Sequence, residues 1–265
     1  MSTQPRIYSI DSYRSILEAA IASGRECVDF EASPAADRRV LYLRHDVDFS
    51  LKMAVELARV NASIGVSATF FVLLRASSYN LHGYRAADRL GELDRLGQRI
   101  GFHYASPLGH KGSYDEHLRS DFSAAHAIFP GLRPVFSWHN PTIEVLEAHR
   151  ERSQIGSLLN VYSSRFTTDV AYHADSNMRY TVDELIRLVT EGPQRVHLLL
   201  HPVYWVGGGE NVPDALARVL IYGVREQEEQ LLDNATYREC FPQGMPERLL
   251  TAFAEEWRQA AGESG

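Results

Sequence analysis

Residues 40–48, Val-Leu-Tyr-Leu-Arg-His-Asp-Val-Asp, form a β-branched and aromatic apolar run that ends in four ionisable side chains. The apolar half is typical of a strand buried on both faces. Because side chains alternate along a strand, Asp46 and Asp48 are predicted to lie on one face, about 7 Å apart at Cα. Two carboxylates this close favour a cation between them or a raised pKa of one of them. Ser50 follows at a helix N-cap position, so strand, polar tip and helix predict an α/β protein with its chemistry at the strand end.

The same order recurs along the chain. Further strands are predicted over 27–30, 67–74, 99–104, 134–140, 157–162, 171–176 and 195–202. Helices are predicted over 8–23, from 51 to about 61–65, and over 86–97, 114–128, 142–150, 182–189, 212–230 and 246–261. This alternation indicates a parallel sheet. Because most of the strands end in a polar residue, a closed sheet is favoured, in which the ends meet at one mouth. The residues expected there are Asp46, Asp48, His103, His139, Asp175 and His201.

Length and charge restrict the class of partner. A chain of 265 residues suits one barrel-sized domain, and its net charge of −7 argues against binding nucleic acid or an anionic membrane surface. We expect a small-molecule or sugar substrate. Cys27 and Cys240 are too few for a zinc site of their own, and no apolar run is long enough to predict membrane insertion. We therefore expect a cytoplasmic protein, while no sequence feature specifies an oligomeric state.

Two aspartates and two or three histidines at one mouth form a nitrogen and oxygen ligand set. Such a set suits a divalent transition metal, with zinc expected first and cobalt, nickel or manganese as alternatives. A catalytic site of this kind uses three protein ligands and leaves a position for water, whose pKa the metal lowers. The second carboxylate is then free as general base and a histidine as general acid. Hydrolysis of an amide or an ester is the reaction that this set favours.

Five short motifs carry a resemblance to a known family. Leu43-Arg-His-Asp-Val-Asp-Phe-Ser50, Ala68-Thr-Phe-Phe71, Ile100-Gly-Phe-His103, Ala174-Asp-Ser176 and Leu199-Leu-His-Pro202 occur in this order. Together they resemble the polysaccharide deacetylases of the NodB-homology class (carbohydrate esterase family 4), and most of all their "RHDVD" subgroup. The resemblance spans residues 8–205. It implies a distorted (β/α)7 TIM-like barrel and a metal-dependent N-deacetylase of acylated amino sugars.

The resemblance also implies roles for single residues. It makes Asp46 the catalytic base, Asp48 a metal ligand, His103 the first histidine of a His-x-x-x-His motif, and His201 the acid of the final Leu-x-His motif. The second histidine of His-x-x-x-His is missing, because position 107 is proline. His139 is the first substitute as third ligand, and His110 is the second. The family's Arg-x-Pro-Tyr motif is also missing, since Ser137-Trp-His-Asn-Pro141 occupies its place.

Other residues are expected to support the site. Arg44 and His45 are predicted to contact the catalytic and metal-binding side chains rather than the metal itself, and alternation predicts that His45 faces away from both aspartates. Asp175 is expected either to orient His201 or a substrate hydroxyl, or to cap the next helix. Three aromatic residues are interpreted either as sugar-stacking surfaces or as packing: Trp138, Tyr204 and Trp205.

The first hypothesis is therefore a cytoplasmic enzyme that removes an N-acetyl group from an amino sugar in surface-glycan biosynthesis. The second is an amide hydrolase for a small cyclic amide. The third is a carbohydrate-binding homologue that has lost its metal, which the proline at 107 favours. We expect one domain over residues 1–265, with an N-terminal helix and linker at 1–39, a barrel core at 40–205 and C-terminal helices at 206–265.

Overall fold

The computed structural model describes residues 7–106 and 114–245, together with residues 252 and 256. Its strands are β1 Glu26–Cys27, β2 Val40–Val47, β3 Thr69–Leu73, β4 Arg99–Tyr104, β5 Val135–Trp138, β6 Gln154–Ile155, β7 Leu158–Asn160, β8 Ala171–Ala174 and β9 Arg195–Leu200. Its α-helices are α1 Ile10–Ala22, α2 Leu51–Ser63, α3 Tyr84–Arg95, α4 Tyr114–Ile128, α5 Ile143–His149, α6 Ser164–Thr167, α7 Val182–Glu191, α8 Pro202–Val206, α9 Val212–Leu231 and α10 Ala235–Cys240.

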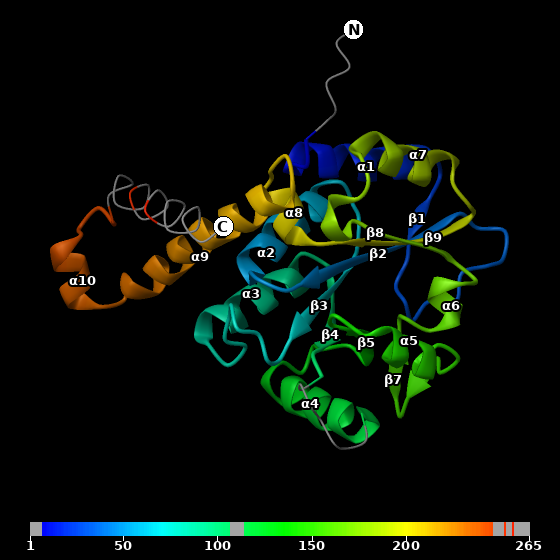
Figure 1. Ribbon diagram of the computed structural model, residues 1–265, viewed down its shortest axis with the longest axis horizontal. Coiled ribbons are helices and arrows are strands. Elements are labelled where there is room, and N and C mark those ends of the chain that lie inside the picture. Colours follow the sequence, from blue (N-terminus) through cyan, green and yellow to red (C-terminus); the bar gives the residue numbers. More distant parts are fainter. Residues whose placement is uncertain (1–6, 107–113, 246–251, 253–255, 257–265) are drawn as a thin grey trace, which may run out of the picture.

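The strands form one curved sheet in the order β6-β7-β5-β4-β3-β2-β9-β8, with β1 paired to the start of β2. All neighbouring strands are parallel except β6 and β7, which form an antiparallel hairpin. Figure 1 shows most of the helices around the outside of this curved sheet and α9 extending away from it. The sheet is thus of the expected α/β type.

The prediction of a closed sheet is only partly confirmed. The sheet curls, but β8 and β6 are its two ends, and no ladder joins them among the described strands. The helix α6 and the residues after it connect β7 to β8 across this opening. The (β/α)7 count stays a prediction, as does the division of the chain into segments. The helix predicted over 246–261 lies almost wholly outside the described residues.

Strict alternation along β2 divides the core in two. Leu41 and Leu43 belong to the larger apolar cluster, which includes the inward faces of α1 and α2. Val40 and Tyr42 belong to the smaller cluster on the concave side of the sheet, where Phe30 and other aromatic rings pack. The apolar layer on the concave side ends at Tyr42, and the next two residues of β2 on that side, Arg44 and Asp46, are charged.

Two local features help to shape the chain near the site, a helix cap after β2 and a glycine within β4. Ser50 caps α2, since its Oγ accepts a hydrogen bond of 3.1 Å from the N–H of Met53, as the sequence predicts. In β4, Gly101 lies against the ring of Phe71, and a Cβ atom there would be 2.7 Å from Cε1 of that ring. Only glycine allows this close approach of β4 to the aromatic side chain.

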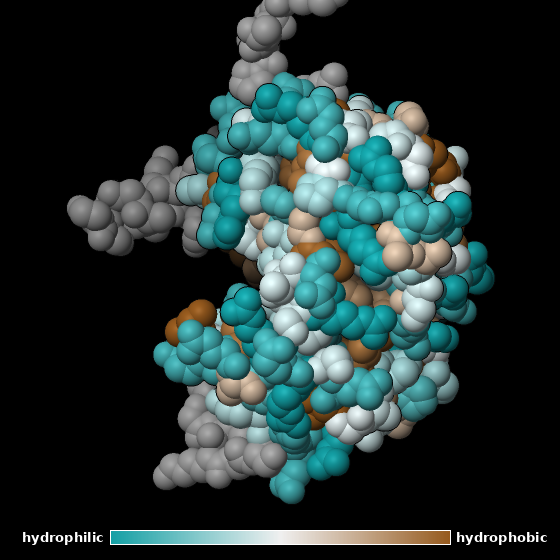
Figure 2. Space-filling model, turned by 90° about the vertical axis from the view of Figure 1, so that its right-hand side faces the viewer, coloured by the Kyte–Doolittle hydropathy of each residue, from teal (hydrophilic) through white to brown (hydrophobic). Residues whose placement is uncertain are grey.

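The described surface exposes mostly polar side chains. The face seen in Figure 2 is mainly hydrophilic, with apolar residues in small separate groups. Within the described part of the chain, no helix combines the length and the apolar character needed to cross a bilayer. The cytoplasmic location stays a prediction.

Candidate metal and acid–base site

Near the C-terminal end of β2, the concave side of the sheet carries a buried ion pair. Nε and Nη2 of Arg44 donate to the two carboxylate oxygens of Asp46 at 2.8 and 2.6 Å. Both side chains are buried, and the guanidinium lies 4.4 Å from the centre of the Tyr162 ring. Burial raises the pKa of Asp46, but the Arg44 guanidinium and then His103 lower it more, so that the net shift is downward. Arg44 therefore keeps Asp46 ionised and fixed in orientation, which is the supporting role predicted for it.

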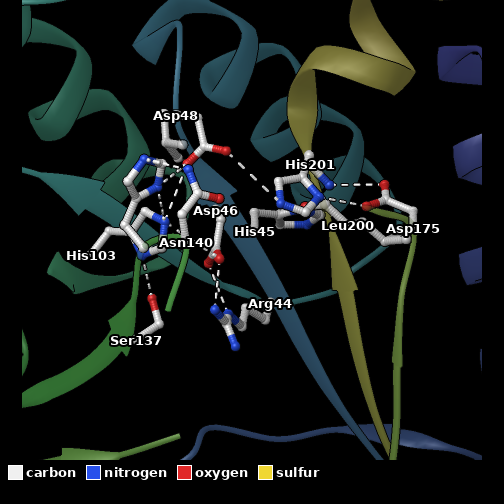
Figure 3. Close-up of polar contacts among 12 residues, drawn as sticks. Arg44, His45, Asp46, Asp48, His103, Ser137, Asn140, Asp175, Leu200 and His201 are labelled. Carbon is white, nitrogen blue, oxygen red and sulfur yellow. Dashed lines mark hydrogen bonds and ion pairs between the residues drawn. The ribbon is translucent and has the colours of Figure 1, made fainter. Parts of the chain in front are cut away.

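Three potential ligand atoms converge above this pair. Oδ1 of Asp48 lies 3.2 Å from Nε2 of His103 and 3.3 Å from Nδ1 of His139, and the two ring nitrogens are 3.1 Å apart. The residues come from the ends of β2, β4 and β5, and a backbone bond from His139 N–H to the carbonyl of Tyr104 extends the pairing of β4 and β5 to this point. Figure 3 shows Asp48 next to His103.

These atoms fit a divalent cation. Oδ1 of Asp48 is buried, and its contacts with the two ring nitrogens lack the geometry of a hydrogen bond, which is costly unless another group compensates the oxygen. One carboxylate oxygen and two imidazole nitrogens, all within 4.8 Å of one another, form a donor set that first-row transition metals accept. The structure thus brings together the three residues that the sequence predicted as metal ligands, with His139 as the third. Pro107 and His110 lie outside the described residues.

Two polar contacts of the histidines were not predicted. Oγ of Ser137 lies 2.7 Å from Nδ1 of His103, and the side-chain amide of Asn140 lies 3.1 Å from Nε2 of His139. Ser137 is fully buried, whereas Asn140 is exposed. The register of β4 and β5 pairs His103 with Ser137, so the strand alignment is the signal that would have found the first contact.

A second group of side chains stands on the other side of β2. Oδ1 of Asp175 lies 2.6 Å from Nδ1 of His201, while its Oδ2 accepts from the N–H of His201 at 2.9 Å and from Nε1 of Trp205 at 2.8 Å. Nε2 of His201 lies 3.9 Å from Oδ2 of Asp48 (Figure 3). Burial lowers the pKa of His201, but the carboxylate of Asp175, followed by those of Asp46 and Asp48, outweighs this and raises the pKa to about 9. His201 is therefore an imidazolium at neutral pH.

His45 faces away from the aspartates, as alternation predicted. Its Nδ1 lies 3.0 Å from the carbonyl oxygen of Leu200, and its Nε2 lies 2.9 Å from the hydroxyl of Tyr13 in α1. Burial lowers its pKa to about 4. His45 thus joins β2 to β9 and to α1 beneath the site.

The sugar-stacking interpretation is wrong for two of the three aromatic residues. Trp138 is 2% exposed and packs against Tyr104 and Phe136, because it points to the helix side of β5, opposite to its neighbours Ser137 and His139. Trp205 is fully buried and stacks on Tyr8 with ring centres 4.3 Å apart. Tyr204, with a ring centre 5.8 Å from that of His201, is buried except for 9% of its surface.

Comparisons with known proteins add little to this geometry. The sequence matches no model of a known protein family and no curated protein. Among solved structures, it is similar to the peptidoglycan deacetylase Bd3279 of Bdellovibrio bacteriovorus, with a TM-score of 0.37 and 15% sequence identity over 86% of this chain. The aligned region covers 55% of that protein, so this chain spans about half its length.

Proposed function

We propose that this chain is a metal-dependent hydrolase that removes an N-acetyl group from an amino sugar. The observation that carries the proposal is the convergence of Asp48, His103 and His139 beside an ionised Asp46 on one side and His201 on the other. A divalent cation bound by the three ligands would polarise the amide carbonyl and lower the pKa of a water molecule. Zinc is the metal proposed first, with cobalt, nickel or manganese as alternatives.

The side chains around the ligands supply the proton transfers. Asp46 accepts a proton from the attacking water at a carboxylate oxygen, and Arg44 holds that carboxylate in place through both of its oxygens. The water oxygen forms a bond to the acyl carbon, and the bond from that carbon to nitrogen breaks. His201 gives the proton on its Nε2 to the departing amine, while Asp175 holds Nδ1 of the same ring. The products are acetate and the free amino sugar.

The choice of an amino-sugar substrate rests on the sequence motifs around residues 43–50, 100–103 and 199–202, which resemble those of the NodB-homology deacetylases. A cytoplasmic location and a role in glycan biosynthesis belong to the same proposal. The proline at 107 favours the alternative of a metal-free binding protein, because it removes an expected ligand. His139 supports the metal-dependent proposal instead, because it offers a third ligand beside Asp48 and His103.

The test is a measurement of bound metal and of acetate release by the purified chain. Each of the four metals is added in turn, with chitooligosaccharides and N-acetylated nucleotide sugars as substrates. We expect one metal per chain and acetate release, both lost in Asp48→Asn and both retained in the exposed control Glu116→Gln. A chain that binds no metal contradicts the proposal. Metal-dependent opening of a cyclic amide without any acetate release would favour the second hypothesis instead.

A further inference from the structure

The segment 137–140 contributes more to the ligand cluster than His139 alone. Ser137, at the end of β5, places its hydroxyl 2.7 Å from Nδ1 of His103. Asn140, which follows His139 directly, places its amide nitrogen Nδ2 3.1 Å from Nε2 of that ring, with the oxygen of the same amide on the other branch. In each histidine, therefore, the nitrogen that does not face Asp48 has a polar partner, and both partners come from this one segment.

The two partners bear on the position of the ring protons. A neutral imidazole carries one N–H, and only the other nitrogen can bind a cation. Nε2 of His103 and Nδ1 of His139 are the atoms that face Oδ1 of Asp48, so cation binding requires the protons on Nδ1 of His103 and on Nε2 of His139. Each of these N–H groups needs an acceptor.

Ser137 and Asn140 can both be that acceptor. The hydroxyl oxygen of Ser137 accepts from Nδ1–H of His103 at the observed distance. The amide of Asn140 accepts when its Oδ1 faces His139, and a half-turn about its last side-chain bond exchanges oxygen and nitrogen with little change in shape.

The backbone explains why asparagine suits position 140. Its φ is +45°, in the left-handed region that glycine, asparagine and aspartate adopt more readily than other residues. This turn follows the end of β5 and lets the side chain reach back to the ring of the preceding residue. Glycine would adopt the turn without offering an acceptor, whereas aspartate would keep both properties.

We infer that Ser137 and Asn140 are positioning residues that fix the metal-binding tautomers of His103 and His139, with Asn140 presenting Oδ1 to Nε2 of His139. This inference rests on the proposed metal site. It assigns a role to the segment that replaces the Arg-x-Pro-Tyr motif. Outer partners of this kind commonly change metal affinity by about 10-fold to 100-fold when they are removed.

The experiment compares the dissociation constant of Zn²⁺, measured by competition with a chromophoric chelator, in four forms of the full chain. The variant Asn140→Gly keeps the left-handed turn and removes the acceptor, so its dissociation constant is expected to rise about 10-fold or more. The variant Asn140→Asp restores an acceptor and is expected to bind at least as tightly as the wild type. The matched control is Asn177→Gly, because Asn177 also has a left-handed backbone, with φ of +60°, and it belongs to the turn after β8 and not to the segment 137–140.

A second readout follows the protons themselves. Nitrogen-15 NMR of the zinc-loaded wild type is expected to show the protons on Nε2 of His139 and on Nδ1 of His103. The inference is overturned if Asn140→Gly binds Zn²⁺ as tightly as the wild type, if Asn140→Asp loses as much affinity as Asn140→Gly, or if the His139 proton is on Nδ1. A wild type that binds no Zn²⁺ or other divalent metal overturns the proposed function as well, so the two failures are distinct.

Discussion

Asp175 and His201 form the shortest of the hydrogen bonds made by the Asp175 carboxylate, with Oδ1 of the carboxylate 2.6 Å from Nδ1 of the ring. Asp175 is fully buried, and its other oxygen is occupied by the backbone of His201 and by Trp205. The carboxylate is therefore held in one orientation by three donors. This arrangement fixes the ring so that Nε2 carries its proton toward the site.

The variant Asp175→Asn tests this relationship. The amide oxygen can keep the bonds from Trp205 and from the backbone of His201, which leaves the NH₂ group facing Nδ1. His201 then becomes a neutral ring and a weaker acid, so we expect kcat to fall about 100-fold or more, with little change in KM. Steady-state acetate release measures both constants, and the exposed Glu116→Gln is again the control. Retention of kcat within threefold of the wild type would reject the assignment of His201 as the acid.

The buried pair Arg44–Asp46 predicts strong coupling in stability. Arg44→Met leaves a carboxylate that is 3% exposed without its cationic partner, and we expect it to lower the free energy of unfolding by about 3–5 kcal/mol. In Arg44→Met combined with Asp46→Asn no buried charge is left unpaired, so the double variant should lose less than the sum of the two single variants. Guanidinium unfolding of the four proteins completes the cycle. Additive losses would show that the pair does not interact as described.

The contact of Gly101 with Phe71 predicts a steric defect on substitution. In Gly101→Ala the new methyl group would lie 2.7 Å from Cε1 of Phe71 and 3.0 Å from Cγ2 of Val135, which forces the packing to shift. We expect a loss of about 1–3 kcal/mol in the free energy of unfolding. Phe71→Leu should recover part of this loss when it is combined with Gly101→Ala. Thermal and denaturant unfolding measure the loss of stability in the single and the double variant. A Gly101→Ala protein as stable as the wild type would contradict the prediction.

A further histidine on the concave side, His197, predicts the dependence of stability on pH. It is fully buried beneath Arg44, its Nδ1 donates to the carbonyl of Phe166 at 3.0 Å, and burial and then Arg44 lower its pKa to about 3. Its pKa in the unfolded chain is about 6.5, so between pH 6.5 and 3 the unfolded chain binds a proton that the folded chain does not. Stability therefore falls as the pH is lowered through this range, by about 1.4 kcal/mol per pH unit from this residue.

The variant His197→Gln checks this value. It removes the titrating group, so its free energy of unfolding should fall less steeply than that of the wild type between pH 6 and pH 4, by about 1.4 kcal/mol per unit. Urea unfolding at half-unit steps of pH gives both slopes, and other groups such as His45 contribute equally to the two proteins. Parallel curves would show that His197 is already protonated in the folded state.

The strands were largely predictable because their apolar runs are continuous and end in polar residues. The expectation that Asp48, His103 and His139 lie together needed only the rule that parallel strands end at one edge of a sheet. The position of Trp138 was predictable too, since it stands between two residues that face inward. Alternation alone assigns it to the opposite face.

Other features depend on contacts that the sequence does not reveal. The strand predicted to run to residue 202 ends at Leu200, because the N–H of His201 binds Asp175 and Pro202 begins α8. The opening between β8 and β6 depends on the curvature of the whole sheet. The partner of His103 depends on the register of β4 and β5, which places Ser137 beside it.

β2 lies between β3 and β9 in the sheet, and the two halves of the site stand on its two sides. The ligands from β4 and β5 belong to one half, and Asp175 and His201 to the other. Since no ladder closes the described sheet on the far side, the spacing between the proposed metal ligands and the proposed proton donor is set by the twist of one strand and its immediate neighbours. Either half can therefore change its loops to suit a wider or narrower substrate while the other half keeps its chemistry.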